Sequence, residues 1–262
     1  YRPSKATRMA HIISLLDTDG QRLALAVIRG ELDPADLLEK GLDLETEVRI
    51  LDLVMEYVQV QYTKEELTKE EYVERFLEAS KTRSSLGRPE GYGYDIPAPS
   101  RPEQGHKPNR LSIGVGYRAW DDLEEGSLYQ ELRFRPTYHD LLDSDKGYSR
   151  GAQIEFFSGA LRYYDSTEKV ELERLDLVNI VSLAPRNRFF KPTSWKVNTG
   201  LKQADLPGGD STLVYSLNPG GGLCYDMRIL GLCYGMFETE INLGGGLSNA
   251  HSIGFGGTLG IL

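Results

Sequence analysis

The sequence predicts a mainly β protein: an antiparallel, up-and-down β-barrel of the transmembrane type with at least eight strands, preceded by a small α-helical segment. Two observations predict this division. Apolar residues recur at helical spacing before residue 86 and at every second position after residue 109. Glycine follows the same division, because six of the 28 glycines lie in residues 1–100 and the other 22 in residues 101–262.

Residues 1–85 carry the pattern of amphipathic helices. Thr68 and Glu71 have the spacing of a capping box, which marks the start of a helix. Residues 86–108 are predicted to be an extended linker, because the stretch 84–108 holds five of the 12 prolines and four glycines. The apolar residues at helical spacing include Leu23, Val27, Ile28, Val48, Leu51, Val54 and Val58.

Residues 109–262 carry the pattern of β-strands. In the first run, Leu111, Ile113, Val115 and Tyr117 alternate with small or charged residues, so one face is apolar. The second run covers about 128–138 and places Tyr129, Glu131, Arg133 and Arg135 together on its polar face. Six further runs follow at about 151–164, 170–183, 194–202, 211–226, 229–242 and 252–262.

The polar face of these runs favours a membrane barrel over a soluble sandwich. A soluble sheet exposes Lys, Glu and Thr on its polar face, whereas the last run places Gly254, Gly256 and Gly260 there, opposite Ile253 and Phe255. Small inward residues suit a barrel wall, and a membrane barrel turns its apolar face to lipid. A soluble lipocalin-like barrel or sandwich has the same period and stays open as an alternative.

Composition excludes several classes of protein. A net charge of −9 and a pI of about 5.1 argue against nucleic-acid binding, which needs a concentrated basic face. No apolar run is long enough for a membrane-spanning helix. Two cysteines, Cys224 and Cys233, cannot form a disulfide framework, and two separate packed thiols are favoured over one cross-strand disulfide. Because the chain starts without methionine and ends inside an alternating run, we expect a fragment of a longer protein.

Several short motifs together carry a family resemblance. The longest is Arg135-Pro-Thr-Tyr-His-Asp-Leu-Leu-Asp143, followed by Gly147-Tyr148. With the opening stretch 1–8, Gly105-His106, Ser182-Leu-Ala-Pro185 and Ser194-Trp195, it resembles the C-terminal part of Gram-negative envelope proteins that carry an Lnb-type N-terminal periplasmic domain. This resemblance implies an upstream periplasmic domain, then a periplasmic helical segment and an outer-membrane barrel. It implies no activity for this segment.

This topology predicts where the connections between strands lie. If the helices are periplasmic, connections 121–126, 165–169 and 203–210 face outside, and connections 139–149 and 184–193 face the periplasm. The distinctive motifs then gather on the periplasmic rim. Its candidate residues are His106, Arg135, His139, Asp140, Asp143, Arg186 and Arg188, and the lumen-facing candidates are Tyr129, Glu131 and Arg133.

The rim cluster admits a functional and a structural interpretation. A histidine beside two carboxylates and an arginine can act in acid/base chemistry, bind a metal or receive an anionic group. The favoured alternative is structural: Asp140 or Asp143 caps a turn, Arg133 and Arg135 pair with Glu131 and Glu155, and His139 bonds across the rim. Ser144 near His139 is a weak hydrolase signal, so no catalytic residue is assigned. The four histidines lack metal-ligand spacing, so no metal or cofactor is predicted.

The sequence thus predicts an outer-membrane anchor or scaffold that contacts membrane lipids and positions the upstream periplasmic domain. The rim cluster around His139 is its expected docking surface. A pore or transport barrel is the first alternative and requires more strands than eight. A soluble ligand-binding β-barrel and a lipid-directed enzyme are the others.

Overall fold

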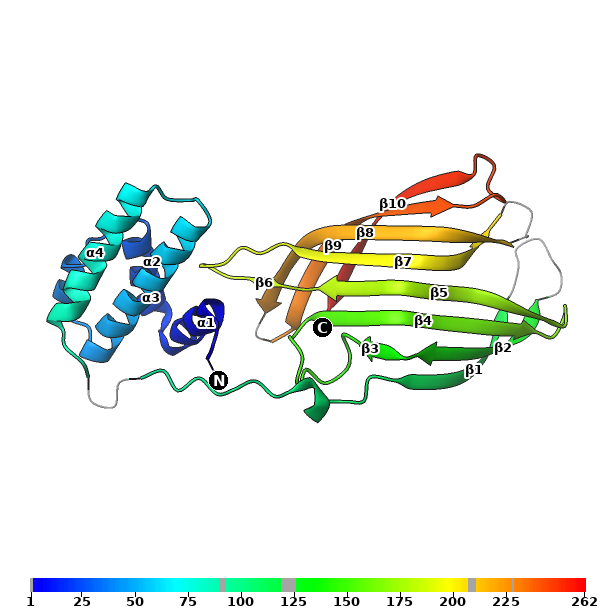
Figure 1. Cartoon of the computed structure of the whole chain (residues 1–262), viewed down its shortest axis with the longest axis horizontal. Helices are drawn as coiled ribbons and strands as arrows, with labels where there is room; N and C mark the ends of the chain where they lie inside the picture. Colours follow the sequence, from blue (N-terminus) through cyan, green and yellow to red (C-terminus); the bar gives the residue numbers. More distant parts are fainter. Residues whose placement is uncertain (1, 90–92, 119–125, 207–210, 228) are drawn as a thin grey trace. The chain divides into compact units, whose positions relative to one another are not determined.

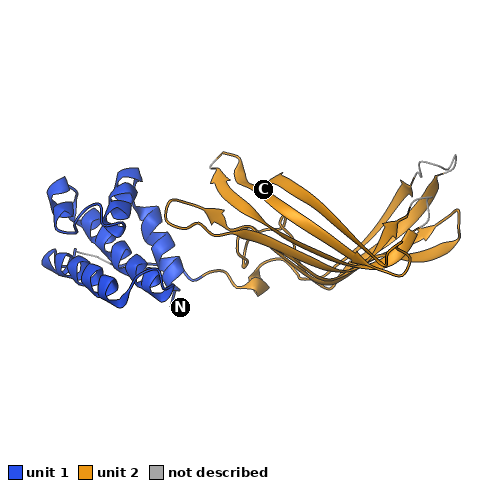
Figure 2. Ribbon diagram, turned by 90° about the horizontal axis from the view of Figure 1, so that it is seen from above, with its two compact units in different colours: residues 1–98 blue, residues 99–262 orange. Residues whose placement is uncertain are grey.

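The computed structural model describes residues 2–89, 93–118, 126–206, 211–227 and 229–262. Within them the chain divides into a helical unit, residues 1–98, and a sheet unit, residues 99–262 (Figure 2). Residues 121–125 and 207–210 of the expected connections 121–126 and 203–210 fall outside the described residues, and residues 203–205 lie at the end of a strand, Ser194–Asp205, instead of in a connection. No helix in the described part of the chain is long and apolar enough to cross a membrane.

The helical unit is built around its longest helix. Its helices are α1 (Lys5–Leu15), α2 (Thr18–Ile28), the short 3₁₀ helix η1 (Asp36–Lys40), α3 (Leu44–Thr63) and α4 (Lys69–Ser85) (Figure 1). Helix α3 contacts α1, α2 and α4, so it buries apolar residues on several sides. Its fully buried side chains include Val48, Ile50, Leu51 and Leu53. The expected capping box is present: Thr68 Oγ1 accepts from the Glu71 N–H, and Glu71 accepts from the Thr68 N–H.

The sheet unit is one antiparallel sheet. Its order is β1-β2-β4-β5-β7-β8-β9-β10, and the short strands β3 and β6 pair with β4 and β8, the latter in parallel. In chain order the strands are β1 (Arg110–Arg118), β2 (Ser127–Arg135), β3 (Thr137–His139), β4 (Ala152–Tyr164), β5 (Lys169–Ser182), β6 (Pro185–Arg186), β7 (Ser194–Asp205), β8 (Ser211–Met227), β9 (Gly231–Leu243) and β10 (His251–Ile261). A short 3₁₀ helix, η2 (Pro102–Gln104), precedes β1.

This arrangement confirms the coarse fold prediction. The sequence predicts a mainly β chain with N-terminal helices and strands joined in consecutive antiparallel order, and the structure has these features. Among the described residues, β1 and β10 form the two edges of one open sheet. Closure of this sheet into a barrel therefore stays a prediction.

The register places side chains of one kind on each face. Leu111, Ile113 and Tyr117 of β1 lie opposite Phe134, Leu132 and Leu128 of β2, so their side chains share the apolar face. Glu131 of β2 lies opposite Arg162 of β4, on the other, polar face. The two-residue period of β1 and β2 thus holds across these neighbouring strands as well.

Strands β4 and β5 depart from the two-residue period; in β5 the register shifts at Glu173 and at Leu177. In β4, Phe157 has a positive φ of 54° and is 60% exposed, whereas Glu155 and Ser158 on either side of it are buried. This irregularity lets Glu155 and Ser158, three residues apart, both reach partners in β5: Asn179 donates to Glu155 Oε2, and Ser158 Oγ donates to Asp176.

The register also shows which strand ends lie together at each end of the sheet. At one end of the sheet, the last residue of one strand pairs with, or lies beside, the first residues of a neighbouring strand. The strand ends that lie there include Arg135, Ser182, Ser194, Met227 and Ile261. We call this the rim. Connections 139–149 and 184–193 lie there, as the alternation of an antiparallel sheet requires. An apolar cluster of Leu183, Cys224, Leu232 and Met236, with Leu141 packed against it, covers the polar face near this rim.

The helical unit should depend on α3 for its stability. Leu53 is fully buried and Leu77 of α4 is 49% exposed. The same substitution at both sites therefore compares the effect of burial on stability. We expect Leu53→Ala to lower the free energy of unfolding of this unit by about 2–5 kcal/mol. Leu77→Ala should lower it by less than about 1 kcal/mol. Urea denaturation of the full chain, followed by helical circular dichroism, measures both; equal losses would contradict the central role of α3.

Candidate functional site

The rim cluster combines three segments of the sheet unit. His106 lies just before β1, Tyr138 and His139 belong to β3, and Asp143 and Tyr148 lie in the connection between β3 and β4. The backbone N–H of Tyr138 donates to the carbonyl of Pro108, at 2.9 Å, and so holds the segment before β1 against β3. Candidates that are 33 residues apart in sequence, His106 and His139, thus become direct neighbours.

Two glycines allow these segments to approach. A Cβ on Gly105 would clash with the Lys146 carbonyl oxygen, and one on Gly147 would lie 2.7 Å from the Arg101 carbonyl oxygen. Gly147 also has a φ of 87°, which residues with a side chain rarely adopt. Both glycines belong to the short motifs of the sequence, Gly105-His106 and Gly147-Tyr148, and each sits beside a ring of the cluster.

The rings of the cluster stack on one another. Tyr148 covers His139 with ring centroids 3.9 Å apart and an angle of 4° between the ring planes. His106 lies 5.2 Å from both His139 and Tyr148, also nearly parallel. This packing leaves His139 only 1% exposed. Burial lowers the pKa of His139 below its ordinary value, as does the neighbouring His106, whereas the carboxylates of Asp143, Asp145 and Asp140 act in the opposite direction.

Hydrogen bonds fix how the two histidines face each other. His106 Nδ1 lies 2.9 Å from the carbonyl oxygen of Lys107, which can only accept, so this nitrogen carries the proton. His106 Nε2 lies 2.9 Å from His139 Nδ1 and 3.7 Å from Asp143 Oδ2. In neutral His106, Nε2 therefore presents a lone pair toward His139 and Asp143.

The other predicted rim residues close a charged network beside the histidines. Arg135 pairs with Asp140 at 3.0 Å and with the buried Glu155 at 3.2 Å. Asp140 accepts from the Leu142 N–H, and Asp143 accepts from the Asp140 N–H, so both aspartates also cap the turn. The structural contacts expected for these residues are thus present, and Arg135 is held by two carboxylates.

Arg186 and Arg188 lie at the same rim but outside this cluster. Arg186 is in β6, which pairs with Tyr225 of β8, and Arg188 follows in an exposed stretch. Within the described part of the chain, neither side chain takes part in an ion pair. Arg188 is exposed and Arg186 is half-buried.

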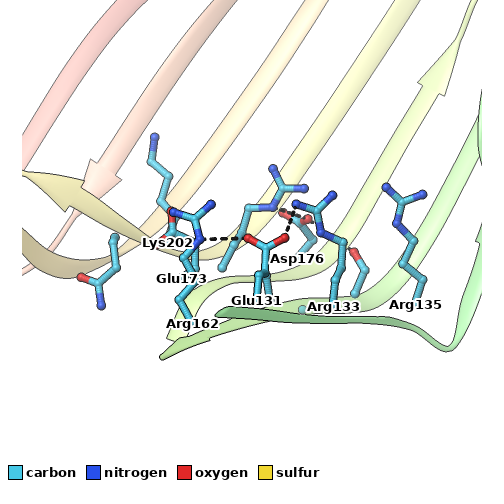
Figure 3. Close-up of a pocket in the computed structure, with 12 residues that line it drawn as sticks. Glu131, Arg133, Arg135, Arg162, Glu173, Asp176 and Lys202 are labelled. Atoms are coloured by element: carbon cyan, nitrogen blue, oxygen red, sulfur yellow. Dashed lines mark hydrogen bonds and ion pairs between the residues drawn. The ribbon is translucent and has the colours of Figure 1, made fainter. Parts of the chain in front are cut away.

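The predicted lumen residues belong to a second cluster, on the polar face. Glu131 accepts from Arg133 and from Arg162, each at 2.9 Å, and Arg162 also pairs with Glu173 at 2.9 Å. Figure 3 shows these side chains projecting from the same side of neighbouring strands toward one another. Tyr129 lies under the Arg162 guanidinium, 4.4 Å from it. All three predicted lumen candidates thus lie at or beside one network.

This network surrounds a polar cavity of about 190 Å³. Five basic and three acidic side chains line it, although the whole chain is acidic, and two of the basic ones, Arg135 and Lys202, also pair with carboxylates outside the lining. The basic residues are Arg133, Arg135, Arg162, Arg174 and Lys202, and the acidic residues are Glu131, Glu173 and Asp176.

Sequence reasoning missed most cross-strand partners on the polar face. Lys196 of β7 reaches Glu238 of β9 at 2.6 Å across the intervening strand β8. The β8 residue between them is Gly220, where a Cβ would lie 3.0 Å from Lys196 Cγ and 3.1 Å from Glu238 Cγ. This ion pair could be predicted only from the alignment of Lys196, Gly220 and Glu238 across the sheet, and that alignment requires knowing the register of three strands.

The two cysteines lie in adjacent strands but not opposite each other. Cys224 faces Tyr234 and Cys233 faces Tyr225, so the two thiols lie on opposite faces of the sheet. Neither cysteine forms a disulfide, in agreement with the prediction of two separate thiols.

Two family models match the chain, and their bounds follow the two units. The model described as Domain of unknown function (DUF7840) matches residues 99–262, and that described as Domain of unknown function (DUF7842) matches residues 1–93. No curated protein matches the chain, and no solved structure matches it.

The rim should loosen when a glycine contact is blocked. We expect Gly147→Ala to lower the stability of the sheet unit by about 1–3 kcal/mol, because it combines a positive φ with a close backbone contact. Gly245, in the turn before β10, has open space within 4 Å of the position that a Cβ would take, so Gly245→Ala is the matched control. Thermal unfolding of the full chain in detergent measures both, and equal midpoints would refute the close approach.

Proposed function

We propose that this chain, which belongs to the family described as Domain of unknown function (DUF7840), is an anchor in the Gram-negative outer membrane. In this proposal the long strands of the sheet form part of a transmembrane β-barrel wall. The barrel contacts outer-membrane lipids, and the helical unit and an upstream domain of the same polypeptide lie in the periplasm. The chain itself carries no assigned catalytic residue or cofactor.

The observation that carries this proposal is the exposed apolar face of the sheet. Ile113 and Val115 of β1 are 82% and 81% exposed, and Leu259 of β10 is 89% exposed. Large exposed apolar patches on a protein mark contact with a membrane or a partner. The exposed large apolar residues of the sheet also include Leu111, Leu128, Leu132, Val170, Leu213, Leu223, Phe237, Ile253, Phe255 and Ile261.

Strand length and the polar face support a membrane setting. Each of the eight strands on the main path has nine or more residues, and a membrane strand needs about 9–11. The polar face carries its own counterions, since Lys196, Lys202 and Arg162 each pair with a glutamate. Such a face suits a barrel interior, where charged side chains lie away from lipid.

The rim is the place where the upstream domain would dock. Arg135, proposed from the sequence as a docking residue, is held by Asp140 and Glu155, so its substitution would also disturb the sheet. Arg188 is exposed and Arg186 half-buried, and neither takes part in an ion pair in the described part of the chain, so both are better placed than Arg135 to pair with a carboxylate of the domain or stack on one of its aromatic rings.

Passage of a solute is the second candidate function. The observation that favours it is the excess of basic over acidic side chains in the lining of the polar cavity, which suits an anionic solute. In liposome swelling experiments, faster uptake of anionic than of neutral solutes of the same size would favour this function over a purely anchoring role.

Location in the outer membrane is the first test of the anchor. We expect the protein, expressed in its native host, to fractionate with the outer membrane. It should migrate faster on a gel when unheated than after boiling, because a closed barrel stays compact in detergent. Recovery from the soluble periplasmic fraction would refute the anchor and leave the soluble ligand-binding barrel.

A charge placed on each face of β1 tests which face meets lipid. We expect Val115→Lys to impair membrane assembly, at a cost of about 2–4 kcal/mol if this position lies near the bilayer midplane. Gly114→Lys is the matched control, because Gly114 is adjacent, points to the polar face and has open space around its Cβ position. The heat-modifiable fraction of each variant in membranes is the measurement. Equal assembly of the two variants would contradict a lipid-facing apolar side.

A further inference from the structure

We propose that His106, His139 and Asp143 form a binding site for a divalent transition-metal ion such as Zn²⁺. The site lies at the rim of the sheet unit. It is independent of whether the apolar face meets lipid, and it goes beyond the sequence prediction of no metal, which rested on the spacing of the histidines along the chain.

Two of the three spacings between the ligand atoms already lie near the distances that a metal requires. One nitrogen of each histidine and one oxygen of Asp143 lie within 4.8 Å of one another. Ligands on a tetrahedral zinc ion are about 3.4 Å apart, given metal–ligand distances of about 2.0–2.2 Å. His106 Nε2 is 2.9 Å from His139 Nδ1 and 3.7 Å from Asp143 Oδ2, so these two spacings differ from the ideal by about half an ångström or less.

The protonation of His106 suits metal binding. The Lys107 carbonyl accepts the proton on Nδ1 at 2.9 Å, so Nε2 of the neutral ring has a free lone pair directed at the site. Ligating histidines commonly donate their other nitrogen to a carbonyl in this way, which fixes the ring and raises its basicity. When a metal binds, Nδ1 of His139 would give up its proton and Nε2 of the same ring would take one up, so that the ring stays neutral and ligates through Nδ1.

Asp143 keeps the negative charge that a cation needs. Arg135 neutralises Asp140 and Glu155 rather than Asp143. In the described part of the chain, the ion-pair partner of Asp143 is His106 alone. The Asp140 N–H donates to Asp143 Oδ2 at 3.0 Å and orients the carboxylate toward the histidines.

The surroundings hold the ligands in place and leave access from solvent. Tyr148 stacks on His139, and the approaches at Gly105 and Gly147 fix the segments that carry the three ligands. The His106 and Asp143 side chains are 20% and 24% exposed, so an ion can enter from outside. Three protein ligands leave a fourth position for water or for a group from a partner.

Titration of the full chain with Co²⁺ and Zn²⁺ tests this site. The protein is purified in detergent without a histidine tag, stripped with a chelator and titrated at neutral pH. We expect one equivalent of Co²⁺ to give the intense visible absorption of a four-coordinate ion, and Zn²⁺ to displace it. His106→Gln should weaken binding by at least about 100-fold, since even the loss of a group that only supports a ligand costs about 10–100-fold.

Two further variants make the result decisive. Asp143→Asn keeps the shape of the side chain and an oxygen that accepts from the Asp140 N–H, so we expect it to fold and to weaken binding at least about tenfold. His251→Gln is the matched control, because His251 is exposed and its ring bonds locally to the Asn249 carbonyl; this variant should bind metal as the unaltered chain does. Circular dichroism verifies that every variant is folded.

The outcomes separate a metal site from a hydrogen-bonded histidine pair. No cobalt absorption in the unaltered chain, or equal affinity in His106→Gln and His251→Gln, would overturn the proposal. Unchanged affinity in folded Asp143→Asn would also overturn it, because the aspartate would then not be a ligand. Selective loss in His106→Gln and Asp143→Asn would establish the site.

Discussion

The sheet depends on the separation of its two faces along every long strand. Away from the apolar cluster at the rim, apolar side chains gather on one face and charged side chains on the other, and the register keeps this separation from β1 to β10. A one-residue slip in any strand would move its charged residues to the apolar face. Glu131, Arg162 and Glu173 oppose such a slip, because they pair only when β2, β4 and β5 keep their register.

The polar face also explains where glycine and the irregularities of the sheet occur. Gly220 leaves room for the ion pair between Lys196 and Glu238, so a strand without a side chain there permits contact between the strands on either side. Phe157 adopts a positive φ, and this irregularity leaves Glu155 beside Asn179. Glu155 also pairs with Arg135, which lies at the rim. Charge pairing on one face thus requires local departures from regular strand geometry.

The sequence predicted the elements better than the contacts between them. A period of two is a local property, so the long strands of the sheet begin and end within about three residues of the alternating runs. The Thr68 and Glu71 capping box is local for the same reason, and it is present. The sequence also predicted a barrel of at least eight strands, but which strands pair with the edges β1 and β10 is not a local property, so no local pattern determines how that barrel closes.

The rim shows why motif spacing along the chain fails to reveal a site that folding assembles. Searching for ligand pairs three or four residues apart suits a helix, whereas an antiparallel sheet brings together residues from connections far apart in sequence. His106 and His139 meet because Pro108 accepts from Tyr138, and because Gly105 and Gly147 permit the approach. Gly105 and Gly147 are needed because a side chain at either position would block a close backbone contact. His106 and Tyr148, which follow them, stack on each other, so both dipeptide motifs serve the same cluster. Short motifs that lie far apart in the sequence can therefore be parts of one site.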